Sequence, residues 1–269
     1  MNEKIKQYWE ERAVKNSNNS SATTGDIWLR ELEIITLIKT LKEIGLLKNS
    51  NVLDVGCGDG YSTLKIAKAF HGINFTGIDY SKNMIKTATT MLKKNPNLIE
   101  NVRFLVGDIL ELEKHFTNSY FDVIISDRCL INLDSLDLQK VAIEKISKLV
   151  KKNGYYIAIE NFVEGHENMN KARSHVDLQE IPIRWHNLFF KEKEFQKMVE
   201  NFFRIISWKN FSSSYYFATR VVYSKMCEMK QVEPDYNHEI HQLSIKLPCT
   251  GNFSPIRMII LQKYKENTT

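Results

Sequence analysis

The stretch 51–60, N-V-L-D-V-G-C-G-D-G, concentrates residues that could hold a nucleotide. Glycine lets a loop turn tightly and lets a ligand lie against bare backbone. Apolar residues at 52, 53 and 55 predict a short buried strand before the glycines, and 61–71 has helical spacing after them. The free N–H groups at the start of that helix would point at the ligand. Strand, glycine loop and helix together predict the first half of a nucleotide-binding βαβ unit.

Three further predicted strands each end in an aspartate. The strands cover 73–79, 102–108 and 121–127, and the aspartates are Asp79, Asp108 and Asp127. Asp79 follows Gly60 by 19 residues, where an acid can accept both hydroxyls of a ribose. Any one of these aspartates alone could be a helix cap or a solvated turn residue. Four strand-end signals in this order favour a binding site at the carboxyl edge of a parallel sheet.

The string D-x-G-C-G-x-G from Asp54 to Gly60 resembles motif I of the class I S-adenosylmethionine-dependent methyltransferases. A dinucleotide fingerprint, G-x-G-x-x-G, would need glycine where the chain has Tyr61, which disfavours a nicotinamide oxidoreductase. The resemblance implies a Rossmann-like α/β fold with a mostly parallel seven-stranded sheet, helices on both faces and a helical cap. It implies S-adenosylmethionine as the cofactor.

The resemblance also assigns cofactor-binding roles along the chain. The glycine loop would pack against the methionine part of the cofactor, Asp79 and Tyr80 would lie at the ribose, and Asp127 would lie where the active site opens. The expected cofactor-binding residues are Asp54, Gly56, Cys57, Gly58, Gly60, Asp79, Tyr80, Asp108, Ile109 and Asp127. Of these, Asp54 would orient the amino group of the methionine part, and Asp108 with the backbone of Ile109 would read the adenine.

We interpret the chain as a single methyltransferase domain, 1–269. Two helices, at 2–14 and 27–44, would cover the cofactor, and their Arg12 and Arg30 are candidates to meet an anion. The expected parts are N-terminal cover helices in 1–48, a cofactor-binding core in 49–161, a substrate cap in 162–254 and a final strand in 255–265. Within the cap, 163–183 is polar and shows no clear period, whereas 215–229 has helical spacing. Asp26 and Gly45 are expected to cap the second cover helix, and Ser81 the helix that follows Asp79.

The cap carries most of the residues that we expect to act on the acceptor. His186, in the string R-W-H-N-L-F-F, is the expected general base, because histidine titrates near neutral pH. A packed, hydrogen-bonded histidine is the alternative, and core packing is the alternative for the tyrosines. The expected catalytic residues are His186, Asp127 and Tyr215, and the expected substrate-binding residues are Arg128, Arg184, Asn187, Tyr216 and Arg220.

A metal site is a weaker hypothesis. Asp127 with Glu160 and Asn161 at the next strand end resembles the acids of the catechol-type methyltransferases, whose oxygen ligands suit Mg²⁺. Glutamate stands where that family has aspartate, and the rest of its pattern is missing. We therefore predict no metal.

Composition and charge limit the kinds of partner that we expect the protein to bind. The 269 residues carry 37 basic and 32 acidic side chains, a net charge of +5 without the clustering of a nucleic-acid footprint. Four cysteines without a C-x-x-C pair, and no apolar run of membrane-spanning length, predict a cytoplasmic protein without a membrane or nucleic-acid partner. The sequence does not predict the oligomeric state.

The predicted function is transfer of a methyl group to a small polar acceptor. The expected methylated atom is an oxygen of a sugar, a nucleotide-sugar or a phosphorylated metabolite. A hydroxyl acceptor would need a positioned base, whereas a phosphate or carboxylate oxygen would need none. The fourth strand does not continue as [D/N/S]-P-P-[Y/F], which disfavours methylation of nucleic-acid bases. An N-methyltransferase, an RNA or protein methyltransferase, and a non-catalytic cofactor-binding protein are the alternatives.

Overall fold

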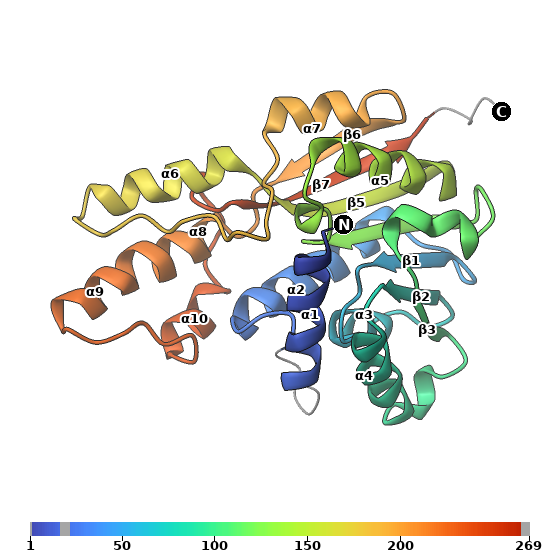
Figure 1. The fold of residues 1–269 in the computed structure, drawn as a ribbon, viewed down its shortest axis with the longest axis horizontal. Coiled ribbons are helices and arrows are strands. Elements are labelled where there is room, and N and C mark those ends of the chain that lie inside the picture. Colours follow the sequence, from blue (N-terminus) through green and yellow to red (C-terminus); the bar gives the residue numbers. More distant parts are fainter. Residues whose placement is uncertain (1, 17–21, 265–269) are drawn as a thin grey trace.

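The computed structural model describes residues 2–16 and 22–264, and its centre is a seven-stranded sheet (Figure 1). The strand order is β3-β2-β1-β4-β5-β7-β6. The strands are β1 (Asn51–Val55), β2 (Asn74–Asp79), β3 (Val102–Val106), β4 (Phe121–Asp127), β5 (Val150–Asn161), β6 (Phe203–Lys209) and β7 (Ile256–Lys263). β1 to β5 pair in parallel, whereas β7 pairs antiparallel with both β5 and β6. The predicted, mostly parallel sheet is confirmed.

Helices cover both faces of this sheet (Figure 1). Alternation along the strands sends Leu53 and Val55 into one apolar core, while Val52 enters the other. The helices are α1 (Glu3–Lys15), α2 (Ile27–Ile44), α3 (Tyr61–Ala67), α4 (Lys82–Lys93), α5 (Leu136–Leu149), α6 (Val163–Ser174), α7 (Glu192–Val199), α8 (Ser213–Tyr216), α9 (Tyr223–Met229) and α10 (Glu239–Ser244). The first core contains residues of α5 and α7, and the second contains residues of α2 and α3.

Local signals set the ends of the helices that border the sheet's carboxyl edge. Asp26 caps α2 by accepting a hydrogen bond from the Leu29 N–H at 3.0 Å. Gly45 ends α2 in the left-handed conformation, with φ of 73°. Ser81 caps α4 through the Met84 N–H at 3.1 Å. Each of these caps was predicted from the sequence and is confirmed.

The cap region departs from the sequence-based expectation. Residues 163–174, which show no apolar period, form the regular helix α6. The buried side of α6 is largely polar, since it includes His166, Asn170 and Arg173. A hydrophobic period cannot reveal a helix that buries polar side chains. The expected helix at 215–229 is interrupted by a π-helical segment, Phe217–Val222, between α8 and α9.

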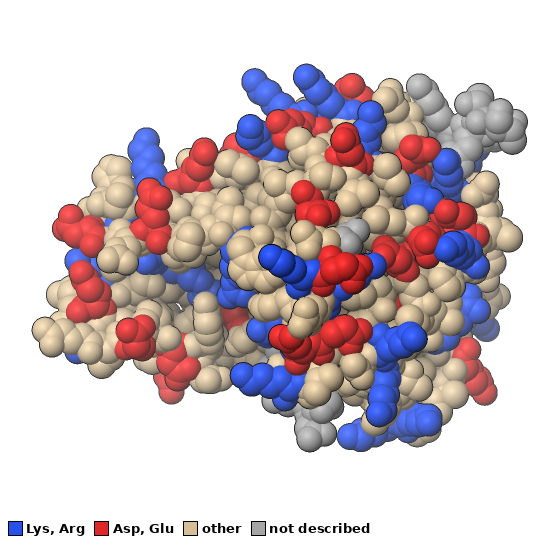
Figure 2. Space-filling model, viewed as in Figure 1, with Lys and Arg blue, Asp and Glu red and all other residues tan. Residues whose placement is uncertain are grey.

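The described surface shows no concentration of one charge on the face seen in Figure 2, where basic and acidic side chains alternate. This distribution agrees with the mild net charge of +5. Among the helices described, none combines the length and the apolar character that crossing a membrane requires.

Candidate active site

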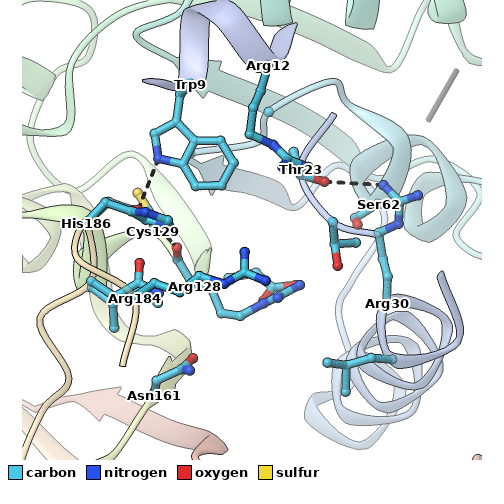
Figure 3. A pocket seen from close by; sticks show the side chains of 18 of the residues that line it. Trp9, Arg12, Thr23, Arg30, Ser62, Arg128, Cys129, Asn161, Arg184 and His186 are labelled. Carbon is cyan, nitrogen blue, oxygen red and sulfur yellow. Dashed lines mark hydrogen bonds and ion pairs between the residues drawn. The ribbon is translucent and has the colours of Figure 1, made fainter. Parts of the chain in front are cut away.

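A cavity of about 460 Å³ lies at the carboxyl ends of β1, β2, β4 and β5 (Figure 3). Pockets of this size, roughly 300–1,000 Å³, are typical of small-molecule and cofactor sites. Helix α1 lies over it: the Trp9 indole donates to Asn132 at 3.1 Å, and Arg12 donates to the carbonyl of Ala22 at 2.8 Å. In Figure 3, Trp9 and Arg12 lie along one wall, Arg184 and His186 on another, and Asn161 opposite Trp9.

One half of the cavity is formed by the glycine loop and the ends of β1 to β4. The predicted residues that line it are Asp54, Gly56, Cys57, Gly58, Asp79, Tyr80, Asp108, Ile109 and Asp127. The loop has left-handed backbone at Gly56 and Gly58, with φ of 74° and 53°. A Cβ on Gly56 would lie 2.4 Å from the Cys129 sulfur, so the loop has room for backbone only.

Asp79 fixes the shape of this loop from the end of β2. One carboxylate oxygen accepts the Gly58 N–H at 3.0 Å, and the other accepts the Ser81 N–H at 2.9 Å. Burial raises the pKa of Asp79 to about 6 and that of Asp54 to about 7. Several carboxyl groups with raised pKa values therefore lie together in the cavity at the carboxyl edge of the sheet.

We expect the variant Gly58→Ala to weaken binding of S-adenosylhomocysteine by ~10-fold or more. The new Cβ would lie 2.5 Å from Cγ2 of Thr23, and the left-handed backbone would cost ~1–2 kcal/mol in addition. Thr23 belongs to the segment that lies over the glycine loop, so the contact would push that segment away. Isothermal titration calorimetry measures the change.

Thr23→Ser supplies a matched rescue for this variant. It removes the offending methyl group but keeps the hydroxyl that accepts from Arg30 at 3.3 Å. The double variant should recover most of the affinity, leaving only the backbone cost. Equal affinity of the single and double variants would show that the steric contact does not matter.

Asp127 and Arg128 form a charged junction between the two halves of the cavity. Arg128 has left-handed backbone, with φ of 51°, and its Nε lies 3.6 Å from Asp127. Its guanidinium also donates at 3.0 Å to Glu33, a fully buried residue of α2. Burial raises the pKa of Glu33 to about 8, although the nearby Arg128 opposes this. A non-glycine residue in this conformation costs ~1–3 kcal/mol, which the two carboxylates help to offset.

The other half of the cavity is lined by residues that follow β5, which we call the acceptor wall. The acceptor wall comprises Asn161, His166, Met169, Ile181, Pro182, Arg184, His186, Asn187, Phe189, Tyr216, Arg220, Tyr236 and Pro255. It contains all the substrate-binding residues predicted in the cap. Arg128, also predicted, lines the cavity beside it.

His186 lies on the acceptor wall but is tightly packed. Its ring stacks on Tyr8 at 4.5 Å between centroids and meets Trp9 edge-on at 5.6 Å. The residue is only 4% exposed, and its Nδ1 has no hydrogen-bond partner among the described residues. Burial, followed by the charges of Arg184 and Arg12, lowers the pKa of His186 to about 4. It is therefore neutral at pH 7, and its role as a base stays a prediction.

Two predicted site residues lie outside the cavity lining. Tyr215 is buried and does not line the cavity, and its hydroxyl donates to Asp26 at 2.6 Å, so the contacts seen here are structural and its catalytic role stays a prediction. Gly60 does not line the cavity but packs closely against other side chains. A Cβ at this position would lie 2.7 Å from both Ala88 and Phe104. Helix α3 can begin against α4 only because this side chain is absent.

The acids of the metal hypothesis do not face one another. Glu160 points into the protein, where it accepts from Ser126 at 2.9 Å and from the backbone of Leu130 and Ile131 at 3.1 and 3.3 Å. Asn161 points into the cavity instead. Within 2–16 and 22–264, no cluster of three potential ligands could hold a metal ion.

Sequence reasoning missed several residues that shape the site. Glu33 looks like an ordinary polar position of α2, and Asn161 entered only the metal hypothesis. Asp26 was predicted as a helix cap, but it also pairs with Arg220, a residue 194 positions later. Only the apolar surroundings of Glu33, between Leu32 and Ile34, could have signalled that it is buried.

The comparisons with known proteins agree with this geometry. Residues 46–217 match the family model of the methyltransferase domain. The chain is 28% identical to human EEF1A lysine methyltransferase 2 over 137 residues, which are 50% of this chain and 57% of that protein. It is 30% identical to demethylmenaquinone methyltransferase of Staphylococcus aureus (strain JH9) over 123 residues, 45% of this chain and 47% of that protein.

A solved structure extends the likeness of the fold to almost the whole chain. Magnesium protoporphyrin IX methyltransferase from Synechocystis PCC 6803, with bound S-adenosylhomocysteine, aligns with a TM-score of 0.62 at 16% identity. The alignment covers 97% of this chain and 98% of that one. By contrast, the chain spans about half the length of the two curated relatives.

The chain belongs to the methyltransferase domain family, because the family model matches well over half of it. The predicted resemblance to the class I S-adenosylmethionine-dependent methyltransferases is thereby confirmed.

Proposed function

We propose that this protein transfers a methyl group from S-adenosylmethionine to an oxygen of a small, negatively charged acceptor. Of the acceptor classes named from the sequence, nucleotide-sugars and phosphorylated metabolites are anionic, and a sugar qualifies where it carries an acidic group. Family membership supports the reaction and the cofactor. The charge distribution of the cavity supports the acceptor class.

The residues of the loop half fit S-adenosylmethionine. The glycine loop is a cradle that side chains would fill, and Asp79 and Asp108 lie at the ends of adjacent strands. Asp79 would accept from ribose hydroxyls, Asp108 would accept from the adenine amino group, and Asp54 would face the methionine amino group. When bound, the cofactor supplies an electrophilic methyl group on a positively charged sulfur.

The observation that carries the acceptor class is the uneven distribution of carboxylates, since arginines line both halves of the cavity. Among the described lining residues, every carboxylate comes from positions 26–127, and the acceptor wall has none. The acceptor wall instead contributes Arg184 and Arg220, two arginines suited to bind a carboxylate or phosphate. Arg220 pairs with Asp26, but no described carboxylate lies within ion-pair distance of Arg184. An acceptor with a negative charge would complete this pairing.

The same observation disfavours a basic acceptor. EEF1A lysine methyltransferase 2 is named for lysine, a cation in its protonated form. A lysine side chain entering this cavity would meet Arg184 without a described carboxylate on the acceptor wall. We therefore rank protein methylation below a small anionic acceptor.

The direct test measures S-adenosylhomocysteine release over a panel of sugars, nucleotide-sugars, phosphorylated metabolites and amines. Turnover of anionic members with an oxygen nucleophile supports the proposal. Turnover confined to amines or to proteins would refute it. The same assay with a metal chelator added tests the metal hypothesis, because a metal-dependent enzyme would then lose its activity.

Arg184→Gln should raise the KM for an anionic acceptor by ~10–100-fold, because one charge-assisted hydrogen bond is worth ~1.5–3 kcal/mol. The affinity for S-adenosylhomocysteine should stay unchanged, since Arg184 belongs to the acceptor wall. The matched control is Lys171→Gln, an exposed cation of α6 that does not line the cavity. Equal KM values for the two variants would show that Arg184 does not bind the acceptor.

A further inference from the structure

The acceptor wall offers poor general bases, and this limits the chemistry of the acceptor. Its described lining residues include no carboxylate, so the candidates are the histidines His166 and His186. Asp127, at the junction of the two halves, is the remaining candidate. Each of these groups is restrained by its contacts.

His186 is restrained by packing. Its ring packs against Tyr8, Trp9 and Trp185, and its buried Nδ1 has no hydrogen-bond partner among the described residues. The pKa of His186 is about 4, so the equilibrium constant for proton transfer to it from a phenol of pKa ~10 would be ~10⁻⁶. A sugar hydroxyl is a weaker acid still.

His166 and Asp127 are already engaged. Nε2 of His166 lies 3.3 Å from the side-chain nitrogen of Asn170, and burial lowers the pKa of this histidine. Asp127 lies 3.6 Å from Nε of Arg128. Protonation of Asp127 would remove an anionic partner of that guanidinium, whose other carboxyl partner is Glu33.

Donors, in contrast, are available on the acceptor wall. Arg184 lines the cavity without an ion pair to a described carboxylate. Asn161 is 7% exposed and its side chain points into the cavity (Figure 3), where its Nδ2 is a donor. The wall around them is apolar at Met169, Ile181 and Phe189. Arg184 itself is an exposed residue at this wall, so an acceptor could reach its guanidinium.

We propose that the methylated oxygen belongs to a carboxylate of the acceptor, so that the product is a methyl ester. This inference rests on the proposed function and narrows it to acidic sugars, their nucleotide-linked forms and other carboxylated metabolites. The planar carboxylate matches the fork of donors on the Arg184 guanidinium. Arg184 and Asn161 then hold and orient the group that reacts.

The reaction balances without a base. A carboxylate oxygen donates an electron pair to the methyl carbon while the carbon–sulfur bond breaks and its electron pair stays on sulfur. The acceptor loses its negative charge, the sulfonium loses its positive charge, and no proton leaves. Positioning of the oxygen in line with the bond that breaks is the protein's main contribution.

The test uses matched pairs of probes that differ in the carboxylate: UDP-glucuronate with UDP-glucose, glucuronate 1-phosphate with glucose 1-phosphate, and 4-hydroxybenzoate with 4-hydroxybenzyl alcohol. The wild-type protein is incubated with each probe and S-adenosylmethionine labelled in the methyl group. Mild alkali then releases the label as volatile methanol from an ester, whereas an ether keeps it. We expect label on carboxylate members only, all of it alkali-labile.

The other outcomes separate this inference from the proposed function. Alkali-stable label on both members of a pair would overturn the ester and leave the proposed function standing. No label on any probe, with S-adenosylhomocysteine bound in calorimetry, would overturn both. In a second readout, UDP-glucuronate should bind the complex with S-adenosylhomocysteine at least 10-fold more tightly than UDP-glucose does. Equal binding of the two would contradict a carboxylate-binding wall.

Discussion

Replacing Asp79 with alanine is expected to weaken binding of S-adenosylhomocysteine by ~100-fold or more. Two hydrogen bonds from ribose hydroxyls to a charged carboxylate are worth ~1.5–3 kcal/mol each, and the variant loses both. It also leaves the Gly58 and Ser81 N–H groups without the acceptor that now lies 3.0 and 2.9 Å away. The glycine loop would then lose its shape together with its ligand contacts. Calorimetric titration measures the affinity.

Two controls define what that loss means. Asp134→Ala removes an exposed aspartate outside the cavity and should bind like the wild type. Asp79→Asn keeps an oxygen acceptor but lacks the charge, and we expect an intermediate affinity. If Asp79→Ala bound within 3-fold of the wild type, the assignment of Asp79 to the ribose would be wrong.

The pH dependence of binding follows from the same residue. Burial raises the pKa of Asp79 to about 6, and hydroxyl donors favour the ionised carboxylate. The part of the affinity that is due to Asp79 should therefore fall as the pH drops through about 6 and be fully present above it. Asp54, whose pKa burial raises to about 7, contributes to the same curve. The part due to Asp79 is the part that Asp79→Asn abolishes.

Several features that depend on neighbours in the chain, such as strand ends and helix caps, could be predicted from the sequence. β4 begins at Phe121 and ends at Asp127 as predicted, because an apolar run stops at a charged residue. Asp26 and Ser81 cap helices because the capping hydrogen bond spans only three residues. The glycine loop was recognisable because its spacing is fixed by a local turn.

Features that depend on tertiary contacts could not be predicted. The ion pair of Arg128 joins residues 95 positions apart, and no local pattern marks Glu33 as its partner. Tyr215 and Tyr216 are adjacent and chemically alike, yet only Tyr216 lines the cavity. The rotation of a single helix decides between them, and that rotation depends on the packing of the cap. His186 was singled out for its chemistry, whereas its surroundings come from α1, almost 180 residues earlier.

Asp26 joins the cover helices to the cap through buried contacts. It is 5% exposed and accepts from the Leu29 N–H at 3.0 Å and from the Tyr215 hydroxyl at 2.6 Å. It also pairs with Arg220, whose guanidinium lies 3.3 Å from Nε2 of His241. One carboxylate thus caps α2 and compensates a partly buried cation that lines the cavity.

We expect Asp26→Ala to lower the free energy of unfolding by ~3–5 kcal/mol, because it leaves Arg220, whose side chain is only 13% exposed, without its anionic partner. Urea unfolding followed by circular dichroism measures the loss. Arg220→Met in the Asp26→Ala background should recover part of it, since the uncompensated charge is then absent. The double-mutant cycle should give a coupling of ~2 kcal/mol or more. Additive effects of the two substitutions would mean that the pair contributes nothing as a pair, and that the loss in Asp26→Ala comes from the helix cap and Tyr215 alone.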